Sequence, residues 1–152
     1  GVTMALPEPI GVLAQIAPED QPLLTTISLI APAIAMGNRV ILIPSENFPS
    51  VALELVQTFE TSDIPPGVIN IVTGDKDELS NQLVGHAEVD GVWCWADSDT
   101  VAKVETTSAL DLKRLWIHSD GDRDWLDPDQ GEGLEFLRNA TEVKNIWTPY
   151  GD

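Results

Sequence analysis

The chain has 152 residues and a mass of 16.5 kDa, which is the length of one ordinary domain. Because 43% of the residues are hydrophobic, the chain can bury a sizeable core, and global disorder is excluded. Eight Lys and Arg against 25 Asp and Glu give a net charge of −17, which argues against nucleic acid and anionic membrane surfaces as partners.

The cysteine content and the apolar runs indicate in which cellular compartment the protein is expected. The single cysteine, Cys94, cannot form an internal disulfide, so the chain fits a reducing compartment. The N-terminus lacks the basic and apolar regions of a signal peptide. The longest apolar stretch, residues 23–36, contains Pro32 and is shorter than the roughly 20 residues of a membrane span. We therefore expect a cytoplasmic protein without a membrane-spanning segment.

From the N-terminus to residue 118, short apolar runs alternate with amphipathic runs. The apolar runs predict five strands, at residues 10–16, 40–43, 69–72, 91–95 and 115–118. The runs between them predict four helices, at residues 23–36, 49–61, 77–84 and 97–109. Continuous Val, Ile and Leu runs separated by helices are typical of a parallel sheet covered on both faces. The sequence therefore predicts a doubly wound α/β domain.

A densely acidic segment follows at residues 119–133, with Arg123 as its lone cation. It also contains Pro128 and three glycines, a composition that is typical of an exposed connection. We expect a solvated loop there. Beyond it, the pattern predicts a short helix at residues 133–140 and a final strand at residues 142–147.

The carboxyl ends of the predicted strands are where a sheet of this kind binds ligands. Three segments occupy these ends: Ile16-Ala17-Pro18-Glu19-Asp20-Gln21-Pro22, Ile43-Pro44-Ser45-Glu46 and Thr73-Gly74-Asp75. Together with Gly37-Asn38-Arg39-Val40 and Pro65-Pro66-Gly67, they resemble in order and spacing the coenzyme-binding domain of aldehyde dehydrogenases, from about Glu8 to Gly121. The resemblance implies a mainly parallel, Rossmann-like sheet of about five strands and NAD(P)-dependent aldehyde oxidation as the parent activity.

Two of the family's binding motifs are altered in this chain. The family has Pro-Trp-Asn-Phe-Pro, whose Asn amide helps hold the oxyanion, where Asp20 places a carboxylate that would repel it. The family has Lys-Pro-Ser-Glu for the adenosine ribose, where Ile43 replaces the lysine. The vestigial candidates for contacting NAD, with weakened affinity, are Ile16, Ala17, Ser45 and Glu46.

The family's turn over the coenzyme pyrophosphate, Phe-Thr-Gly-Ser-Thr-x-x-Gly, is also altered. Ala96 and Val101 replace its two glycines, so a close approach of the backbone to phosphate is sterically harder. Asp97 and Asp99 place carboxylates at the start of the helix whose positive end would receive the phosphates. The resemblance therefore implies no bound cofactor, with weak NAD binding as the alternative.

The family's general base is the Glu of a Leu-Glu-Leu-Gly-Gly stretch, and His118 stands at that position. No nucleophile accompanies it, because Cys94 aligns with an apolar strand position. We therefore predict no catalytic residue and interpret Asp20 and His118 as degenerate positions. The alternative interpretation is a repurposed acid/base pair.

The chain continues directly into residues 136–147, which resemble the family's C-terminal oligomerisation strand, without the catalytic domain that precedes it in the family. This arrangement resembles the second, degenerate unit of the tandem family 16 aldehyde dehydrogenases. We expect a degenerate coenzyme domain at 1–118, an acidic loop at 119–133, and a helix with an oligomerisation-type strand at 134–152. Residues 141–148 would join a second copy or the remainder of a tandem chain.

No metal site is predicted. Asp120, Asp122 and Asp124 have the spacing of a calcium loop, but Trp125 and Gly131 stand where Gly and Glu are required. Two functions stay open: a non-catalytic structural or oligomerisation module, and an adenine-nucleotide or NAD binding module without chemistry. An active aldehyde oxidoreductase is disfavoured, because the nucleophile, the oxyanion amide and the general base are all missing.

Overall fold

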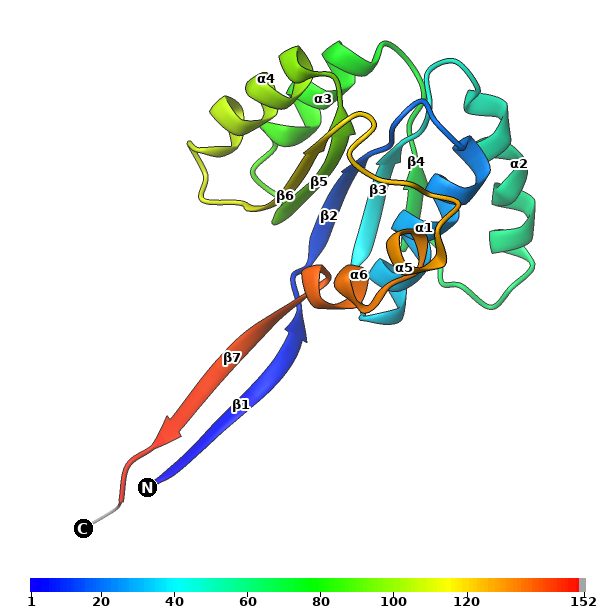
Figure 1. Cartoon of the computed structure of the whole chain (residues 1–152). Helices are drawn as coiled ribbons and strands as arrows, with labels where there is room; N and C mark the ends of the chain where they lie inside the picture. The colour runs from blue at the N-terminus through cyan, green and yellow to red at the C-terminus, as the bar shows by residue number, and fades with distance from the viewer. Residues whose placement is uncertain (151–152) are drawn as a thin grey trace.

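The computed structural model describes residues 1–150. Its body is built on a five-stranded sheet in the order β4-β3-β2-β5-β6, and every neighbouring pair is parallel (Figure 1). The strands are β2 (Val12–Ile16), β3 (Arg39–Ile43), β4 (Ile69–Ile71), β5 (Gly91–Ala96) and β6 (Arg114–Ser119). The predicted α/β fold with five parallel strands is confirmed.

Four helices cover the two faces of this sheet. They are α1 (Pro22–Ala35), α2 (Pro49–Glu60), α3 (Lys76–Val84) and α4 (Ser98–Ser108). Helix α1 packs against α2 on one face, and α3 packs against α4 on the other (Figure 1). Between residues 1 and 150, no helix has the length and apolar character needed to cross a membrane.

Alternation along β5 divides the core between the two faces. Trp93 and Trp95 pack with α1 residues such as Leu29 in one buried cluster. Cys94 points the opposite way and packs with Val84 of α3 in the other cluster. Both tryptophans are almost fully excluded from solvent.

A two-stranded antiparallel ribbon projects from the body (Figure 1) and is formed by β1 (Val2–Pro9) and β7 (Thr141–Thr148). The final strand was predicted, whereas β1 was not, since its two prolines are unusual in a strand. Gly11, with a φ of 129°, separates β1 from β2, so the strand that was expected from Ile10 begins at Val12.

The prediction of a solvated loop at residues 119–133 is partly wrong. The segment contains the short helix α5 (Pro128–Gly131) and leads into α6 (Leu134–Asn139), and α1 contacts both. Trp125 is only 5% exposed because it packs into the cluster beneath α1. The acidic side chains remain at the surface, but the segment covers one face of the sheet.

Asn38 joins the body to the base of the ribbon. Its buried side chain accepts a hydrogen bond from the Gly11 amide at 3.0 Å, through Oδ1. Its Nδ2 donates to the Ala33 carbonyl at 3.0 Å and to the Ala140 carbonyl at 2.8 Å. The side-chain amide of Asn38 therefore forms hydrogen bonds with backbone groups just before β2, near the end of α1 and just before β7.

Substitution Asn38→Ala should lower the free energy of unfolding by about 2–3 kcal/mol, because it takes the acceptor from the Gly11 amide and the side-chain donor from the buried Ala140 carbonyl. The matched control is Asn70→Ala, whose amide bonds the Val40 and Gly67 carbonyls from an exposed position and should cost about 1 kcal/mol or less. Urea unfolding followed by circular dichroism measures both, and equal losses would contradict the role of Asn38.

Candidate functional site

A cavity of about 420 Å³ lies at the carboxyl ends of the parallel strands, where a sheet of this kind places its ligand site. Its lining is strongly acidic and contains one lysine. The lining residues are Glu19, Glu46, Asn47, Asp75, Lys76, Asp77, Ala96, Asp97, Thr100 and Asp120. We call this cavity the strand-end cleft.

The carboxylate of Glu19 occupies one wall of the strand-end cleft. It accepts hydrogen bonds from the Ser45 hydroxyl at 2.6 Å and from the backbone amides of Glu46 and Asn47 at 3.1 and 3.0 Å. These donors lie in the loop between β3 and α2, just before the helix begins. An anion is favoured at such a position, and the chain supplies one from its own sequence.

Lys76 is the only cation in the lining of the cleft. Its side chain is nearly buried, and its Nζ forms an ion pair with Glu19 and donates to the Ala17 carbonyl at 2.9 Å. The backbone amide of Lys76 also donates to Glu46 at 3.4 Å. Lys76 was not among the predicted site residues, although a lysine directly after the Gly74-Asp75 turn at the end of a strand is a signal for such a role.

The starts of α3 and α4 are also held by carboxylates of the chain. Asp97 caps α4 by accepting from the amides of Asp99 and Thr100 at 2.9 and 3.0 Å. Asp75 caps α3 by accepting from the Glu78 amide at 2.8 Å. The amide groups that face the cleft at these two helix starts therefore already have acceptors.

The pKa values follow from these contacts. Desolvation raises the pKa of Glu19, but the hydrogen bonds from Lys76, Ser45, Asn47 and Glu46 outweigh it and lower the pKa to about 2. For Asp120, desolvation by burial raises the pKa above its usual value. The charge of Lys76 opposes this shift, whereas the charges of Asp97 and Glu19 add to it. The cleft thus holds one carboxyl group whose pKa is lowered, Glu19, and one whose pKa is raised, Asp120.

The vestigial candidates lie around this cleft, but the degenerate catalytic positions do not line it. Ser45 and Glu46 contact Glu19 and Lys76, whereas Ile16 and Ala17 are fully buried below. Asp20 is exposed and is not part of the lining. The structure therefore does not bring Asp20 and His118 together in the strand-end cleft.

His118 lies instead in an aromatic cluster, whose other members are Trp95, Trp116, Trp125 and Phe136. Its ring stacks on Trp95 with centroids 5.4 Å apart, and its buried Nε2 has no hydrogen-bond partner. The guanidinium of Arg123 lies 5.1–5.8 Å from the centroids of the four aromatic rings and pairs with Glu135 at 2.8 Å. His118 is thus packed under residues of the 119–137 segment.

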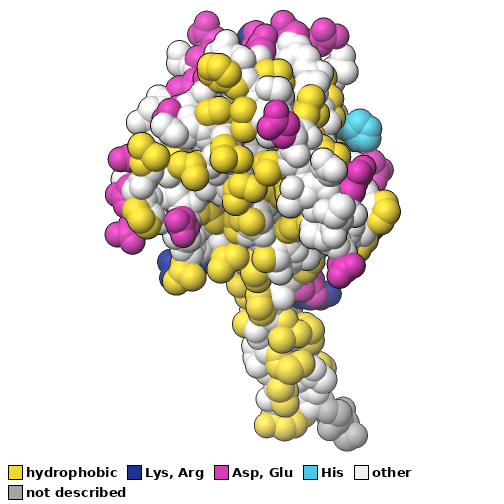
Figure 2. Space-filling model, turned by 90° about the vertical axis from the view of Figure 1, so that its right-hand side faces the viewer, with side chains coloured by type: hydrophobic (Ala, Val, Ile, Leu, Met, Phe, Trp, Pro, Cys, Tyr) yellow, Lys and Arg dark blue, Asp and Glu magenta, His cyan; other side chains and the backbone are white. Residues whose placement is uncertain are grey.

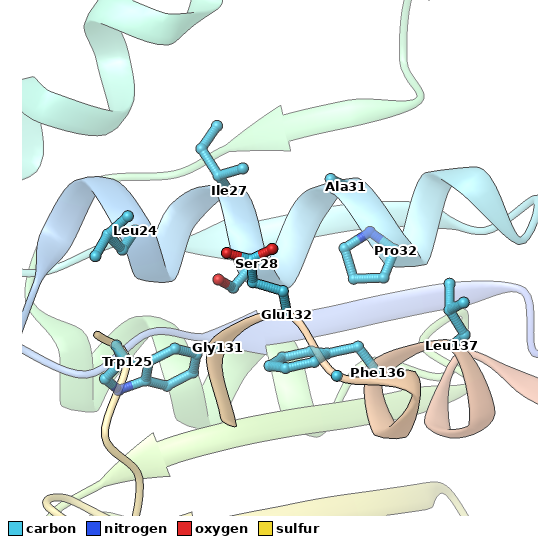
Figure 3. Close-up of a pocket in the computed structure, with 11 residues that line it drawn as sticks. Leu24, Ile27, Ser28, Ala31, Pro32, Trp125, Gly131, Glu132, Phe136 and Leu137 are labelled. Carbon is cyan, nitrogen blue, oxygen red and sulfur yellow. The ribbon is translucent and has the colours of Figure 1, made fainter. Parts of the chain in front are cut away.

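A second cavity is an apolar groove of about 330 Å³ beside this cluster. Figure 3 shows α1 on one side of the groove, with Leu24 and Ile27, and Trp125 and Phe136 on the other. Glu132 is the one charged residue in its lining. Among residues 1–150, no group of three or more His, Cys, Asp or Glu side chains could hold a metal ion.

Cys94 lies on β5, fully buried. Desolvation by burial raises the pKa of its thiol to about 12, so the thiol stays protonated at neutral pH. A thiolate is needed for nucleophilic attack, so the environment of Cys94 is that of a core residue.

Comparison with known proteins places the chain among the aldehyde dehydrogenases. Residues 1–125 match the model of the aldehyde dehydrogenase family. The chain is 37% identical over 122 residues to the NADP/NAD-dependent aldehyde dehydrogenase PuuC of Escherichia coli (strain K12), covering 79% of this chain and 24% of that protein. It is 34% identical over 141 residues to betaine aldehyde dehydrogenase of Vibrio vulnificus (strain CMCP6), covering 93% and 29%.

Solved structures agree with this assignment. A C291A mutant of aldehyde dehydrogenase C from Pseudomonas syringae, in complex with NAD⁺ and octanal, superposes with a TM-score of 0.76 at 35% identity. The match covers 80% of this chain and 25% of that one. The chain thus spans about a quarter of the length of these relatives.

Substitution Glu19→Gln tests the internal anion. The pKa of Glu19 is lowered from 4.5 to about 2 in the fold, so its stabilisation is complete above about pH 5 and is lost as the pH falls toward 2. Because 34% of the side chain is exposed, solvent screening limits the expected loss at pH 7 to about 1 kcal/mol. Unfolding curves of both proteins from pH 7 to pH 2 should converge at the acid end, and a constant difference would contradict this assignment.

Proposed function

The chain belongs to the aldehyde dehydrogenase family, and from this premise we propose that it is a non-catalytic, pseudoenzyme-type module with a structural and oligomerisation role. In this proposal the module is part of, or derived from, a larger NAD(P)-dependent aldehyde dehydrogenase. Its three parts are the degenerate coenzyme domain at 1–118, the acidic segment at 119–133, and the tail at 134–152. Residues 151 and 152 of the tail lie outside the described residues.

The observation that supports this proposal best is the set of carboxylates in the strand-end cleft. Glu19, Asp97 and Asp75 already accept hydrogen bonds from backbone amides at or just before three helix starts. A coenzyme phosphate would need these amides as its donors. Three further carboxylates, Glu46, Asp77 and Asp120, also line the cavity, and Lys76 is paired with Glu19. A dinucleotide with an anionic pyrophosphate does not fit this arrangement without displacing them.

The surroundings of the degenerate catalytic positions support the same proposal. A general base must reach the group from which it removes a proton, and His118 stacks on Trp95 with its Nε2 buried. Cys94 is a buried, protonated thiol. Asp20 replaces the neutral amide of the family motif with a carboxylate, which would oppose a developing oxyanion.

A structural role is supported by the ribbon of β1 and β7. An isolated two-stranded ribbon is marginal in water, and this one projects from the body with apolar side chains exposed. Residues 141–148 would associate with a second copy or with the remainder of a tandem chain.

A second candidate function is a weak NAD or adenine-nucleotide binding module. Ser45 and Glu46 stand at the positions of the family's ribose-binding motif. Glu46 lines the cleft, and the Ser45 hydroxyl donates to Glu19 in its wall. The family's lysine is replaced by Ile43, but Lys76 places another cation in the cleft. For this function, the hydrogen bonds from the Glu46 and Asn47 amides to Glu19 must break when the ligand binds.

Calorimetric titration with NAD separates the two candidates. The wild-type chain should give no heat at millimolar NAD, where binding is worth about 4 kcal/mol. A variant with Glu19→Ala, Asp97→Ser and Asp120→Gly should gain measurable binding, at least about tenfold tighter than the wild type, because the carboxylates leave and Lys76 is freed.

The matched control removes three exposed acids away from the cleft, Glu54, Glu60 and Glu105, as alanines, and should leave NAD binding unchanged. Micromolar NAD binding by the wild-type chain would establish the second candidate. NADH formation from an aldehyde by the wild-type chain would overturn the non-catalytic assignment.

A further inference from the structure

Helix α1 is apolar on the side that faces the sheet and on the side that faces away from it. Leu29 is fully buried in the cluster against the sheet, whereas Leu24 and Ile27 are exposed. The sequence contains no charged residue between Asp20 and Arg39. A helix that is hydrophobic all round is normally covered all round. Helices α2, α5 and α6 contact α1 but leave the side chains of Leu24 and Ile27 exposed.

The exposed side of α1 is one wall of the apolar groove (Figure 3). The lining residues that α1 contributes are Leu24, Ile27, Ser28, Ala31 and Pro32. They recur at i, i+3, i+4, i+7 and i+8, which is the spacing of a single helix face. At a rise of 1.5 Å per residue they cover about 12 Å of the helix. The groove therefore follows α1 for about two turns.

The opposite wall of the groove is closely packed. Trp125 and Phe136 are almost fully buried, and their ring centroids lie 6.2 Å apart. A Cβ on Gly131 would lie 2.7 Å from the Trp125 carbonyl oxygen, so the backbone is at its closest approach there. Arg123 pairs with Glu135 at 2.8 Å behind this wall. The groove is thus formed by internal packing, and a ligand does not have to open it.

The apolar surface extends beyond the groove. Leu23, Leu126 and Leu134 adjoin lining residues in the sequence and are between 50% and 66% exposed. Figure 2 views the side on which α1 and α2 lie, and it shows hydrophobic side chains gathered across the middle of the body. The volume of about 330 Å³ is near the lower end of the range for small-molecule pockets, about 300–1,000 Å³. A small apolar groove within a larger exposed apolar surface favours a macromolecular partner.

The rim of the groove is acidic. Residues 124–135, which include the wall opposite α1, contain five Asp and Glu and no Lys or Arg. Asp124, Asp129 and Glu132 are exposed, and Glu132 itself lines the groove. None of these three takes part in an ion pair within residues 1–150. Together with the net charge of −17, this rim favours a cationic partner and opposes a second copy, whose own rim is acidic.

We propose that the apolar groove binds a basic amphipathic helix of a protein partner. The helix lies along α1 and places apolar side chains at i, i+3 or i+4, and i+7 in the groove, over Leu24 and Ile27. Its Lys and Arg side chains face Glu132 and the other acids of the rim. This surface is separate from the ribbon of β1 and β7, so the inference goes beyond the structural role proposed above.

Fluorescence anisotropy of a labelled model peptide tests the proposal on the full chain. The probe is an amphipathic peptide of about 15 residues, with leucines at i, i+3, i+4 and i+7 and with lysines and alanines elsewhere. At about 0.15 M salt, where contacts between distant charges are screened, it should bind with a dissociation constant of about 10 µM or below. The same peptide with glutamates in place of the lysines should not bind.

Two variants with the same charge separate the groove from the general acidity of the chain. Substitution Ile27→Lys places a cation in the apolar groove and should weaken binding at least about tenfold. The matched control, Leu110→Lys, adds the same charge at an exposed leucine after α4, which does not line the groove, and should change binding by less than about twofold.

A second pair of variants tests the rim. Substitution Glu132→Gln should weaken binding of the lysine peptide about threefold, since an exposed ion pair at the rim is lost. Glu54→Gln removes the same charge from the surface of α2 and should leave binding unchanged. Circular dichroism of each variant verifies that the fold is retained.

No binding of the lysine peptide at about 100 µM would overturn the inference, and so would equal losses in Ile27→Lys and Leu110→Lys. Self-association of the wild-type chain that Ile27→Lys abolishes would assign the groove to a second copy instead. Micromolar binding of octylammonium without binding of the peptide would assign it to a small organic cation. None of these readouts involves NAD, so NAD binding or NADH formation would overturn the proposed function and leave this inference untouched.

Discussion

The carboxylate of Glu19 on the amides of Glu46 and Asn47 is the contact on which the functional account depends. Parallel strands and helix starts gather backbone donors at one edge of the sheet, and these donors require an acceptor. Here the acceptor belongs to the chain, and Lys76 neutralises it from the opposite side. The amides at this edge and the side chains of Glu19 and Lys76 thereby form one polar network.

The chain also covers the face of the sheet on which α1 packs. There the segment 119–137 folds over the aromatic cluster. Arg123 places its charge among four aromatic rings, and Trp125 and Phe136 fill the space beneath α1. His118 is held in this cluster by stacking on Trp95. Side chains of the chain itself thus accept from the amides at the strand-end cleft and pack over the neighbouring face, whereas the ribbon leaves apolar side chains exposed. This contrast supports a role in association over a role in chemistry.

Much of the fold could be predicted from the sequence, because continuous runs such as Val40–Ile43 have few alternatives to a buried parallel strand. The positions of Ser45 and Glu46 at the cleft follow from the same reasoning. The pairing of Glu19 with Lys76 could not be predicted, since it joins residues 57 positions apart that only the sheet topology brings together. The strand β1 could not be predicted, because prolines are unusual in strands. They are tolerated here because their backbone nitrogens face away from β7, where no N–H is needed.

The central claim is that the amides at the carboxyl ends of the strands are occupied by carboxylates of the chain itself. Amide nuclear magnetic resonance spectra of the wild-type chain, recorded during addition of NAD to millimolar concentration, test it residue by residue. The account predicts that the signals of Glu46, Asn47, Asp99 and Thr100 do not move, because their acceptors are already in place. Saturable shifts of these four signals at micromolar NAD would contradict it.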